Sequence, residues 1–295
     1  MNTYLAPPQS LPFELGEPAA FGGLALVPLF PTAGPRLEYI GLDEAAATGL
    51  AVTEVDEAGS VATLFVSNPL EANVLLFEGE ELVGAKQNRI LDRSILVQAR
   101  SKTPVPVSCV ERGRWASRSE RFAPAPRTAY PDLRRAKREG GGQAEVWTNV
   151  AAKSLRLDAW SPTDASEEMY VKRGASLEEY VARLPRRDGQ SGAIVCVAGR
   201  VVCLDFVGRS DVYAGLYPKL LRGYALDAIE RPLDAPLPKE YVASLLRRIV
   251  RATRAATPVV GLGQERRLES SRLVGSELMV GEELVALSVF PRTAA

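Results

Sequence analysis

The sequence contains no histidine among its 295 residues, and this absence removes several classes of mechanism. A Ser-His-Asp or Cys-His triad cannot be built without imidazole, and neither can the usual zinc sites. Any general acid or base must therefore be Glu, Asp, Lys, Cys or Tyr with a shifted pKa. Zinc is not favoured as a cofactor, whereas a hard divalent cation such as magnesium, calcium or manganese could still bind carboxylates.

Cysteine is scarce as well, with three residues in the chain: Cys109, Cys196 and Cys203. Three thiols are too few for a disulfide scaffold, and no CxxC spacing indicates a metal site. Residues 192–207 read as a hairpin, in which a two-residue turn at Gly199-Arg200 would place Cys196 and Cys203 opposite each other on one face. We interpret these two as small core residues in a reducing environment, with a redox pair as the alternative.

Long apolar runs are absent too. No stretch of about eighteen apolar residues occurs, so no helix of the chain is expected to span a membrane. The first eight residues, MNTYLAPP, lack the basic start and the apolar stretch of a secretory signal. We therefore expect a cytoplasmic protein without membrane partners.

Charge is balanced over the whole chain but not along it. Residues 1–99 carry 13 acidic and 4 basic residues, whereas residues 100–139 carry 11 basic and 4 acidic ones. The basic block could bind nucleic acid or an anionic small molecule, remain a solvated loop, or dock on the acidic part of its own fold. We favour the solvated or self-docking interpretations, and nucleic-acid binding is the weakest because aromatic residues are sparse there.

The pattern of apolar residues predicts an α+β fold. Short alternating strands recur about every eight to twelve residues between positions 51 and 110, which is typical of an antiparallel β sandwich or a jelly-roll-like unit. We assign residues 1–115 to this unit, residues 116–142 to a basic flexible loop or linker, and residues 143–295 to a mixed half of helices and hairpins that packs on the first. Within that half, a helix over residues 212–229 should break near Pro218.

Two polar segments interrupt the predicted strands. Residues 78–89 read EGEELVGAKQNR, and residues 107–115 read VSCVERGRW. Glu80 and Glu111 are candidates for a general base or a metal ligand, because clustered carboxylates raise one another's pKa and suit hard cations. Cys109 is a candidate nucleophile if a nearby cation lowers its pKa, although a buried structural cysteine is the simpler interpretation.

Other side chains of these segments have the chemistry of an anion site. Lys86, Arg89 and Arg114 can hold a phosphate or a carboxylate, while Gln87 and Asn88 offer amide donors and acceptors. The alternative is internal, since these cations could pair with the nearby glutamates and lock the sheet. The residue types favour neither explanation over the other.

Aromatic residues add a possible stacking surface. Trp115 could stack on a ligand, and Gln143 and Trp147, four residues apart, share one face of a predicted helix. In the alternative interpretation both tryptophans anchor the core. We include all three residues among the candidate ligand contacts.

At these residues the chain resembles the ARG and Rhodanese-Phosphatase-superfamily-associated protein domain, a bacterial family of unknown function. The resemblance rests on both polar segments and on QAEVW at 143–147, SPT at 161–163 and the Asp205-Phe206 step. It implies at most a link to ADP-ribose or nucleotide metabolism, and it brings no fold, substrate or catalytic residue. The family usually has an acid where Gly142 stands and a histidine near Leu287 and Ser288, so none of these positions is given a catalytic role.

Two hypotheses follow. In the first, the protein binds an anionic, nucleotide-like or ADP-ribose-related small molecule at a histidine-free polar site, and the sequence leaves open whether it also acts as an enzyme. In the second, it is a non-catalytic interaction or structural protein whose polar segments form an internal ion-pair lattice. The sequence does not determine the oligomeric state.

Overall fold

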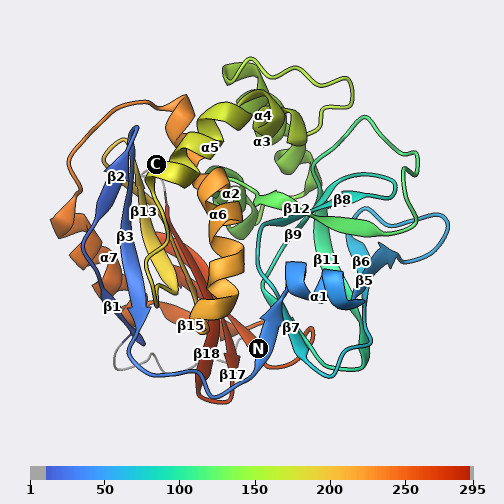
Figure 1. Ribbon diagram of the computed structural model, residues 1–295, viewed down its shortest axis with the longest axis horizontal. Helices are drawn as coiled ribbons and strands as arrows, with labels where there is room; N and C mark the ends of the chain where they lie inside the picture. Colours follow the sequence, from blue (N-terminus) through green and yellow to red (C-terminus); the bar gives the residue numbers. More distant parts are fainter. Residues whose placement is uncertain (1–10, 293–295) are drawn as a thin grey trace.

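The computed structural model describes residues 11–292, which form seven helices and eighteen strands. Nine of these strands make one antiparallel sheet, three make a small sheet, and six close into a barrel. In Figure 1 the barrel lies on the right and the large sheet on the left, with the long helix α6 (Ser210–Glu230) between them. The predicted α+β class is confirmed.

The barrel consists of strands whose apolar residues alternate in sequence and point inward. Val52, Leu82 and Val107, from three different strands, meet in its core. The sandwich or jelly-roll detail is not confirmed, because the strands close on themselves with the help of a strand beyond residue 115. Around the barrel the strands are β11 (Ser101–Cys109), β6 (Thr63–Asn68), β5 (Ala51–Glu54), β12 (Phe122–Thr128), β8 (Glu80–Gly84) and β9 (Arg89–Leu91).

One end of the barrel is plugged by the small sheet and a short helix. Leu42, Leu76 and Ile95 from these elements join the barrel core. At the opposite end, which we call the covered end, Glu54, the hairpin of residues 84–89 and the loop of residues 112–121 lie together. The plugging elements are β4 (Tyr39–Gly41), β7 (Asn73–Leu76), β10 (Ile95–Val97) and α1 (Leu42–Thr48).

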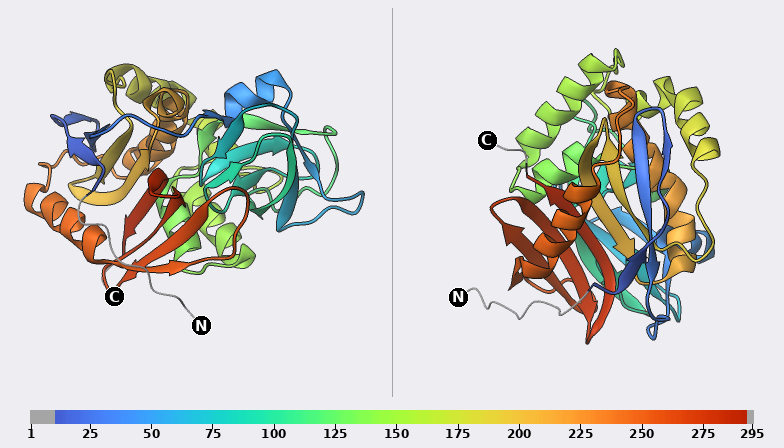
Figure 2. Two further views of the ribbon diagram at one scale, coloured as in Figure 1. Left: turned by 90° about the horizontal axis from the view of Figure 1, so that it is seen from below. Right: turned by 90° about the vertical axis from the view of Figure 1, so that its left-hand side faces the viewer.

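The large sheet joins the two ends of the sequence. Of its three N-terminal strands, β3 (Leu24–Pro31) pairs with β13 (Gly192–Val197) and the other two pair with β3, so residues 13–31 lie with the second half of the chain and not with the barrel (Figure 2). The order is β1-β3-β13-β14-β18-β17-β16-β15, with β2 paired to β3. The strands are β1 (Phe13–Leu15), β2 (Ala19–Phe21), β3 (Leu24–Pro31), β13 (Gly192–Val197), β14 (Arg200–Val207), β15 (Thr253–Ala256), β16 (Gln264–Ser270), β17 (Leu273–Val280) and β18 (Glu283–Pro291).

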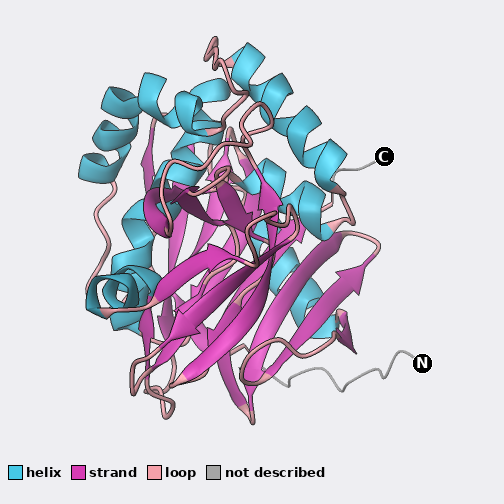
Figure 3. Ribbon diagram, turned by 90° about the vertical axis from the view of Figure 1, so that its right-hand side faces the viewer, coloured by secondary structure: helices cyan, strands magenta, loops and turns pink. Residues whose placement is uncertain are grey.

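Helices bury both faces of this sheet, which explains why its central strands are apolar on both sides. Tyr224 of α6 packs on one face with Val195, and Leu245 of α7 packs on the other with Ile194. Figure 3 shows helices above the strands and on both sides of them. Of the helices within residues 11–292, none has both the length and the apolar character needed to cross a membrane. The remaining helices are α2 (Pro131–Arg138), α3 (Gln143–Arg156), α4 (Glu167–Lys172), α5 (Gly174–Arg183) and α7 (Lys239–Arg251).

Residues 116–142, expected as a basic loop or linker, contain strand β12 and helix α2. Their basic residues are used inside the fold: Arg127 pairs with Glu81, and Arg138 pairs with Glu78. Since the acidic partners lie in the first hundred residues, the charge asymmetry reflects self-docking of the basic block. The division of the chain into separate domains stays a prediction.

The predicted break near Pro218 is wrong, because α6 continues through it. An interior proline removes one backbone hydrogen bond and costs about 3 kcal/mol. Leu216, Leu220 and Tyr224 are buried on either side of it. Tertiary packing of this central helix therefore outweighs the local penalty.

The predicted placement of Cys196 and Cys203 on one face is also wrong. The turn lies one residue earlier, at Ala198-Gly199, whose φ angles of 48° and 73° are typical of a type I′ hairpin turn. A register shift after Val195 sets Cys203 opposite Val195 and Cys196 opposite Val201. The two thiols therefore lie in the separate apolar clusters on either side of the sheet.

Candidate functional site

Glu78 and Glu81, from the first polar segment, are buried and paired with arginines from distant parts of the chain. Glu81 accepts two parallel hydrogen bonds from Arg127, at 2.8 Å from Nε and 2.9 Å from Nη2. Glu78 pairs with Arg138 of α2, and burial nevertheless raises the pKa of Glu78. The two carboxylates therefore link β8 and the residues just before it to elements that lie more than forty residues later in the chain.

Glu80 lies at the plugged end of the barrel. Its carboxylate accepts hydrogen bonds from Lys219 Nζ of α6 at 2.6 Å and from the backbone N–H of Phe77 at 2.8 Å. Lys219 also contacts Asp43 at 3.1 Å. Burial raises the pKa of Glu80 more than Lys219 lowers it. The structure therefore does not bring Glu80 together with Glu111, the other candidate base.

Glu111 and Arg114 form a clamp in the second polar segment. Arg114 donates to the Glu111 carboxylate at 2.8 Å from Nε and 2.6 Å from Nη2, and its Nη1 donates to the Ala85 carbonyl at 2.5 Å. Glu111 also accepts from the Asn88 backbone N–H at 3.1 Å and from Thr163 Oγ1 at 3.0 Å. Burial alone would raise the pKa of Glu111, but these hydrogen bonds outweigh it and lower the pKa. The clamp holds the 84–89 hairpin against residues 107–115.

Replacing Glu111 with glutamine is expected to reduce stability at neutral pH by about 1–2 kcal/mol, because an amide cannot accept both hydrogen bonds from Arg114. The folded-state pKa lies below the usual 4.5, so the carboxylate contributes fully above that value and loses its contribution as the pH falls through the folded-state pKa. In urea unfolding, the difference in stability between the wild type and Glu111→Gln should be constant near neutrality and should begin to shrink once the pH falls below 4.5. A gap that persists unchanged in acid would contradict the role of the ionised clamp.

Gln143 and Trp147 flank Cys109 from helix α3. The Gln143 side chain accepts from the Cys109 N–H and donates to the Cys109 carbonyl, both at 2.8 Å, so its amide extends the end of β11. Trp147 is half-buried, and its indole Nε1 has no hydrogen-bond partner among the described residues. Burial raises the pKa of the Cys109 thiol, while the Glu111 backbone N–H and the charge of Arg89 act in the opposite direction. Burial thus disfavours the thiolate form that a nucleophilic cysteine needs.

Arg89 differs from the other arginines of the barrel. It is 0 % exposed, and Nη1 donates to Gln87 Oε1 at 3.0 Å. Its Nε and Nη2 have no partner within residues 11–292. These two groups form the edge that Arg114 and Arg127 each present to a carboxylate. Burial lowers the pKa of Arg89, since its charge is not fully compensated.

Trp115 covers Arg89. Its ring lies 5.7 Å from the Arg89 guanidinium carbon and 5.3 Å from Lys86 Nζ, and 47 % of the residue is exposed. Lys86 also donates to the Ala58 carbonyl at 2.8 Å, in the turn after β5. The half-exposed tryptophan therefore packs against a guanidinium that is fully buried.

Glu54 is a member of this cluster that sequence reasoning missed. It ends β5 and shares the inward side of that strand with Val52. Its Oε1 accepts from the Lys86 backbone N–H at 3.4 Å, whereas its Oε2 is buried without a partner among the described residues. An acidic residue at an inward-facing strand position was the signal that could have identified it.

The structure thus divides the candidate residues into groups. Glu80 is at the plugged end, and Glu111, Arg114 and Asn88 belong to the clamp, in which the Asn88 side chain also donates to Glu167 at 3.1 Å. The Gln143 side chain forms hydrogen bonds with the backbone of Cys109. The candidates that lie near Arg89 at the covered end are Lys86, Gln87, Cys109 and Trp115, whereas Trp147 packs with Arg112.

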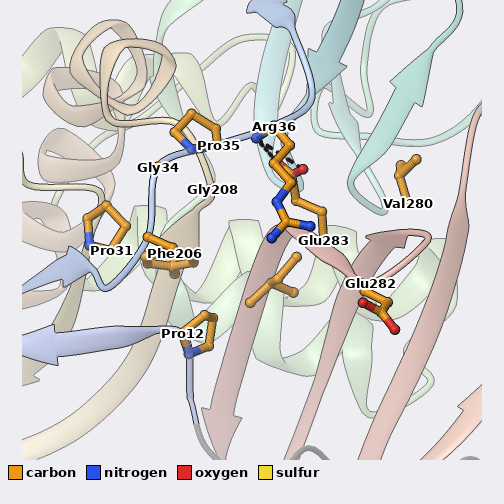
Figure 4. A pocket seen from close by; sticks show the side chains of 12 residues that line it. Pro12, Pro31, Gly34, Pro35, Arg36, Phe206, Gly208, Val280, Glu282 and Glu283 are labelled. Atoms are coloured by element: carbon orange, nitrogen blue, oxygen red, sulfur yellow. Dashed lines mark hydrogen bonds between the residues drawn. The ribbon is translucent and has the colours of Figure 1, made fainter.

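The prominent clefts of the surface lie elsewhere. A cleft of about 430 Å³ is lined by Arg36, Phe206 and Glu283, where the sheet meets the chain after β3 (Figure 4). Of five clefts that stand out within residues 11–292, none is lined by Lys86, Arg89 or Glu111. In the same residues, no three acidic or cysteine side chains converge in a way that could hold a metal ion.

Comparison with known protein families assigns the chain to one of them. The model of the ARG and Rhodanese-Phosphatase-superfamily-associated Protein domain matches residues 12–290, which is nearly the whole chain. The chain belongs to this family. No curated protein and no solved structure matches it significantly. The matched region of this family includes the barrel with its covered end, the large sheet and all seven helices of residues 11–292.

Proposed function

We propose that the protein binds an anionic, nucleotide-like small molecule at the covered end of the barrel. The observation that carries this proposal is the open Nε–Nη2 edge of the buried Arg89. This edge of a guanidinium matches two oxygens of a phosphate or carboxylate. An unpaired charge away from water costs several kcal/mol, so an unpartnered edge here is favourable only if a ligand fills it.

The surroundings of Arg89 support an oxyanion with an attached ring. Gln87 holds Nη1 and so fixes the direction of the open edge. Lys86 adds a second positive charge beside the same tryptophan. Because Trp115 is about half exposed, a rotation of its side chain would uncover Arg89 and offer a stacking face to a base.

The proposal changes the roles of several candidates. Arg114 and Asn88 shape the wall of the site through the clamp, and Gln143 fixes the backbone of Cys109. No reaction type is proposed, since the carboxylates Glu80 and Glu111 are each engaged with a cation. The family description records an association with ARG and rhodanese-phosphatase proteins, which is compatible with a nucleotide-like ligand.

Binding is tested by thermal shift and calorimetry with pyrophosphate, AMP, NAD and ADP-ribose, with and without magnesium. Arg89→Lys keeps the charge but loses the two-point edge, so we expect at least about a tenfold loss of affinity. Arg100→Lys is the matched control, because Arg100 is 71 % exposed and pairs with Glu71 away from the covered end. Absence of binding by the wild type, or equal affinity in Arg89→Lys, would refute the proposal.

A non-catalytic interaction protein is the second candidate function. Its support is that Glu78, Glu80, Glu81 and Glu111 all pair with cations and line none of the clefts except the small one beside α1, which includes Glu80. On this account the polar segments shape the fold. It predicts that none of the four ligands shifts the melting temperature and that Arg89→Lys changes stability alone.

A further inference from the structure

Glu54 is a further unpartnered polar group at the covered end. Its Oε2 is buried and has no hydrogen-bond partner among the described residues, although carboxylates in such positions normally accept several hydrogen bonds. Its Oε1 is held by the Lys86 backbone N–H, which leaves Oε2 as the oxygen available to a ligand.

Glu54 Oε2 lies beside Gly59, in the turn after β5. A Cβ atom built on Gly59 would lie 3.3 Å from Glu54 Oε2 and 3.4 Å from Trp115 Cζ2. The carboxylate oxygen therefore lies near the edge of the Trp115 ring, whose centre is 5.7 Å from the Arg89 guanidinium. A carboxylate and a guanidinium thus both lie near Trp115, and yet the Arg89 edge and Glu54 Oε2 both lack a hydrogen-bond partner among the described residues.

The two groups have complementary requirements. The Arg89 edge supplies two N–H donors, and Glu54 Oε2 supplies an acceptor. A bare oxyanion would satisfy Arg89 but would be repelled by the carboxylate and leave it unpaired. An oxyanion that carries a hydroxyl group would satisfy both, because the hydroxyl donates to Oε2.

We propose that Glu54 selects oxyanions that carry a hydroxyl donor, so that the ligand class is a hydroxylated phosphate such as a sugar phosphate. This inference rests on the proposed function of Arg89 and adds a specificity-determining residue to it. A site with a fixed acceptor discriminates strongly against ligands without the donor, because the buried acceptor is then left unsatisfied. The donor could be the P–OH of phosphate itself or a hydroxyl of an attached sugar.

Three probes distinguish these sources: sulfate has no donor, inorganic phosphate has a P–OH, and ribose 5-phosphate adds sugar hydroxyls. We expect the wild type to bind phosphate or ribose 5-phosphate at least about tenfold more tightly than sulfate in calorimetry. Glu54→Gln should remove this preference while sulfate affinity stays equal or increases, because the repulsion is lost. Glu57→Gln is the control, since Glu57 is exposed in the same turn and undergoes the same change of charge.

The outcomes separate the inference from the proposed function. If the wild type binds none of the probes, or if Arg89→Lys binds all of them as well as the wild type does, the proposed function fails and the inference fails with it. If sulfate binds as tightly as the other two, or if the preference survives Glu54→Gln, only the role of Glu54 is refuted. Glu54→Asp is a second variant in case Glu54→Gln folds poorly. Its shorter side chain keeps the charge but moves the carboxylate away from the ligand, so the preference for phosphate or ribose 5-phosphate over sulfate should be lost.

Discussion

Replacing Arg134 with alanine is expected to destabilise the protein by about 3–5 kcal/mol. Arg134 is 1 % exposed and donates to both oxygens of Asp205, at 2.8 Å and 2.7 Å. Asp205 is itself 0 % exposed, and its pKa is lowered because this guanidinium offsets the effect of burial. Without the arginine, a buried carboxylate would keep only neutral hydrogen-bond donors, namely Tyr224, Ser288 and the weakly donating thiol of Cys203. Urea unfolding followed by circular dichroism measures the loss.

Arg100→Ala is the control for this prediction, because the Arg100–Glu71 pair is largely exposed and should contribute less than about 1 kcal/mol. The double substitution Arg134→Met with Asp205→Asn removes both charges and should recover part of the loss. If Arg134→Ala cost no more than Arg100→Ala, the buried lattice would not contribute to stability in the way described.

Replacing Arg89 with methionine should increase the stability of the protein, in contrast to the loss expected for Arg134→Ala. Methionine fills similar space without a charge, and the unpartnered edge of Arg89 makes burial of the guanidinium unfavourable. We expect the free protein to gain about 2–3 kcal/mol of stability, which corresponds to about 4–10 °C in melting temperature. The same substitution should abolish anion binding.

This pairing of higher stability with lost binding is typical of a residue kept for function. Arg127→Met is the informative comparison, because Arg127 has the same side chain but pairs fully with Glu81. It should lose stability. A loss of stability in Arg89→Met as large as that in Arg127→Met would show that Arg89 is structural.

Local sequence patterns predicted the strands of the barrel but not its closure. The alternation around Val52, Leu64 and Val105 identified inward-facing residues, since strand periodicity is a local property. Strand β12 contains Pro124 and Pro126, which disfavour a strand when only the sequence is considered. Its pairing with β5 and β8 depends on tertiary contacts that no local window contains.

The candidate site was predicted in part for a similar reason. The density of polar residues in residues 78–89 was a correct sign that they serve a special purpose. Most of that purpose is pairing with Arg127, Arg138 and Lys219, which are separated from their partners by 46 to 139 positions. Sequence spacing therefore could not show that Arg89 alone among the barrel arginines keeps an open edge.

The most direct test of the central claim is a crystal structure determined with phosphate present. The open edge of Arg89 predicts a tetrahedral anion with two oxygens about 2.7–3.0 Å from Nε and Nη2, and a Trp115 side chain rotated away from its present position. If instead Glu54 closes on both nitrogens of Arg89 and no anion binds there, the covered end is an internal ion pair and the account is wrong.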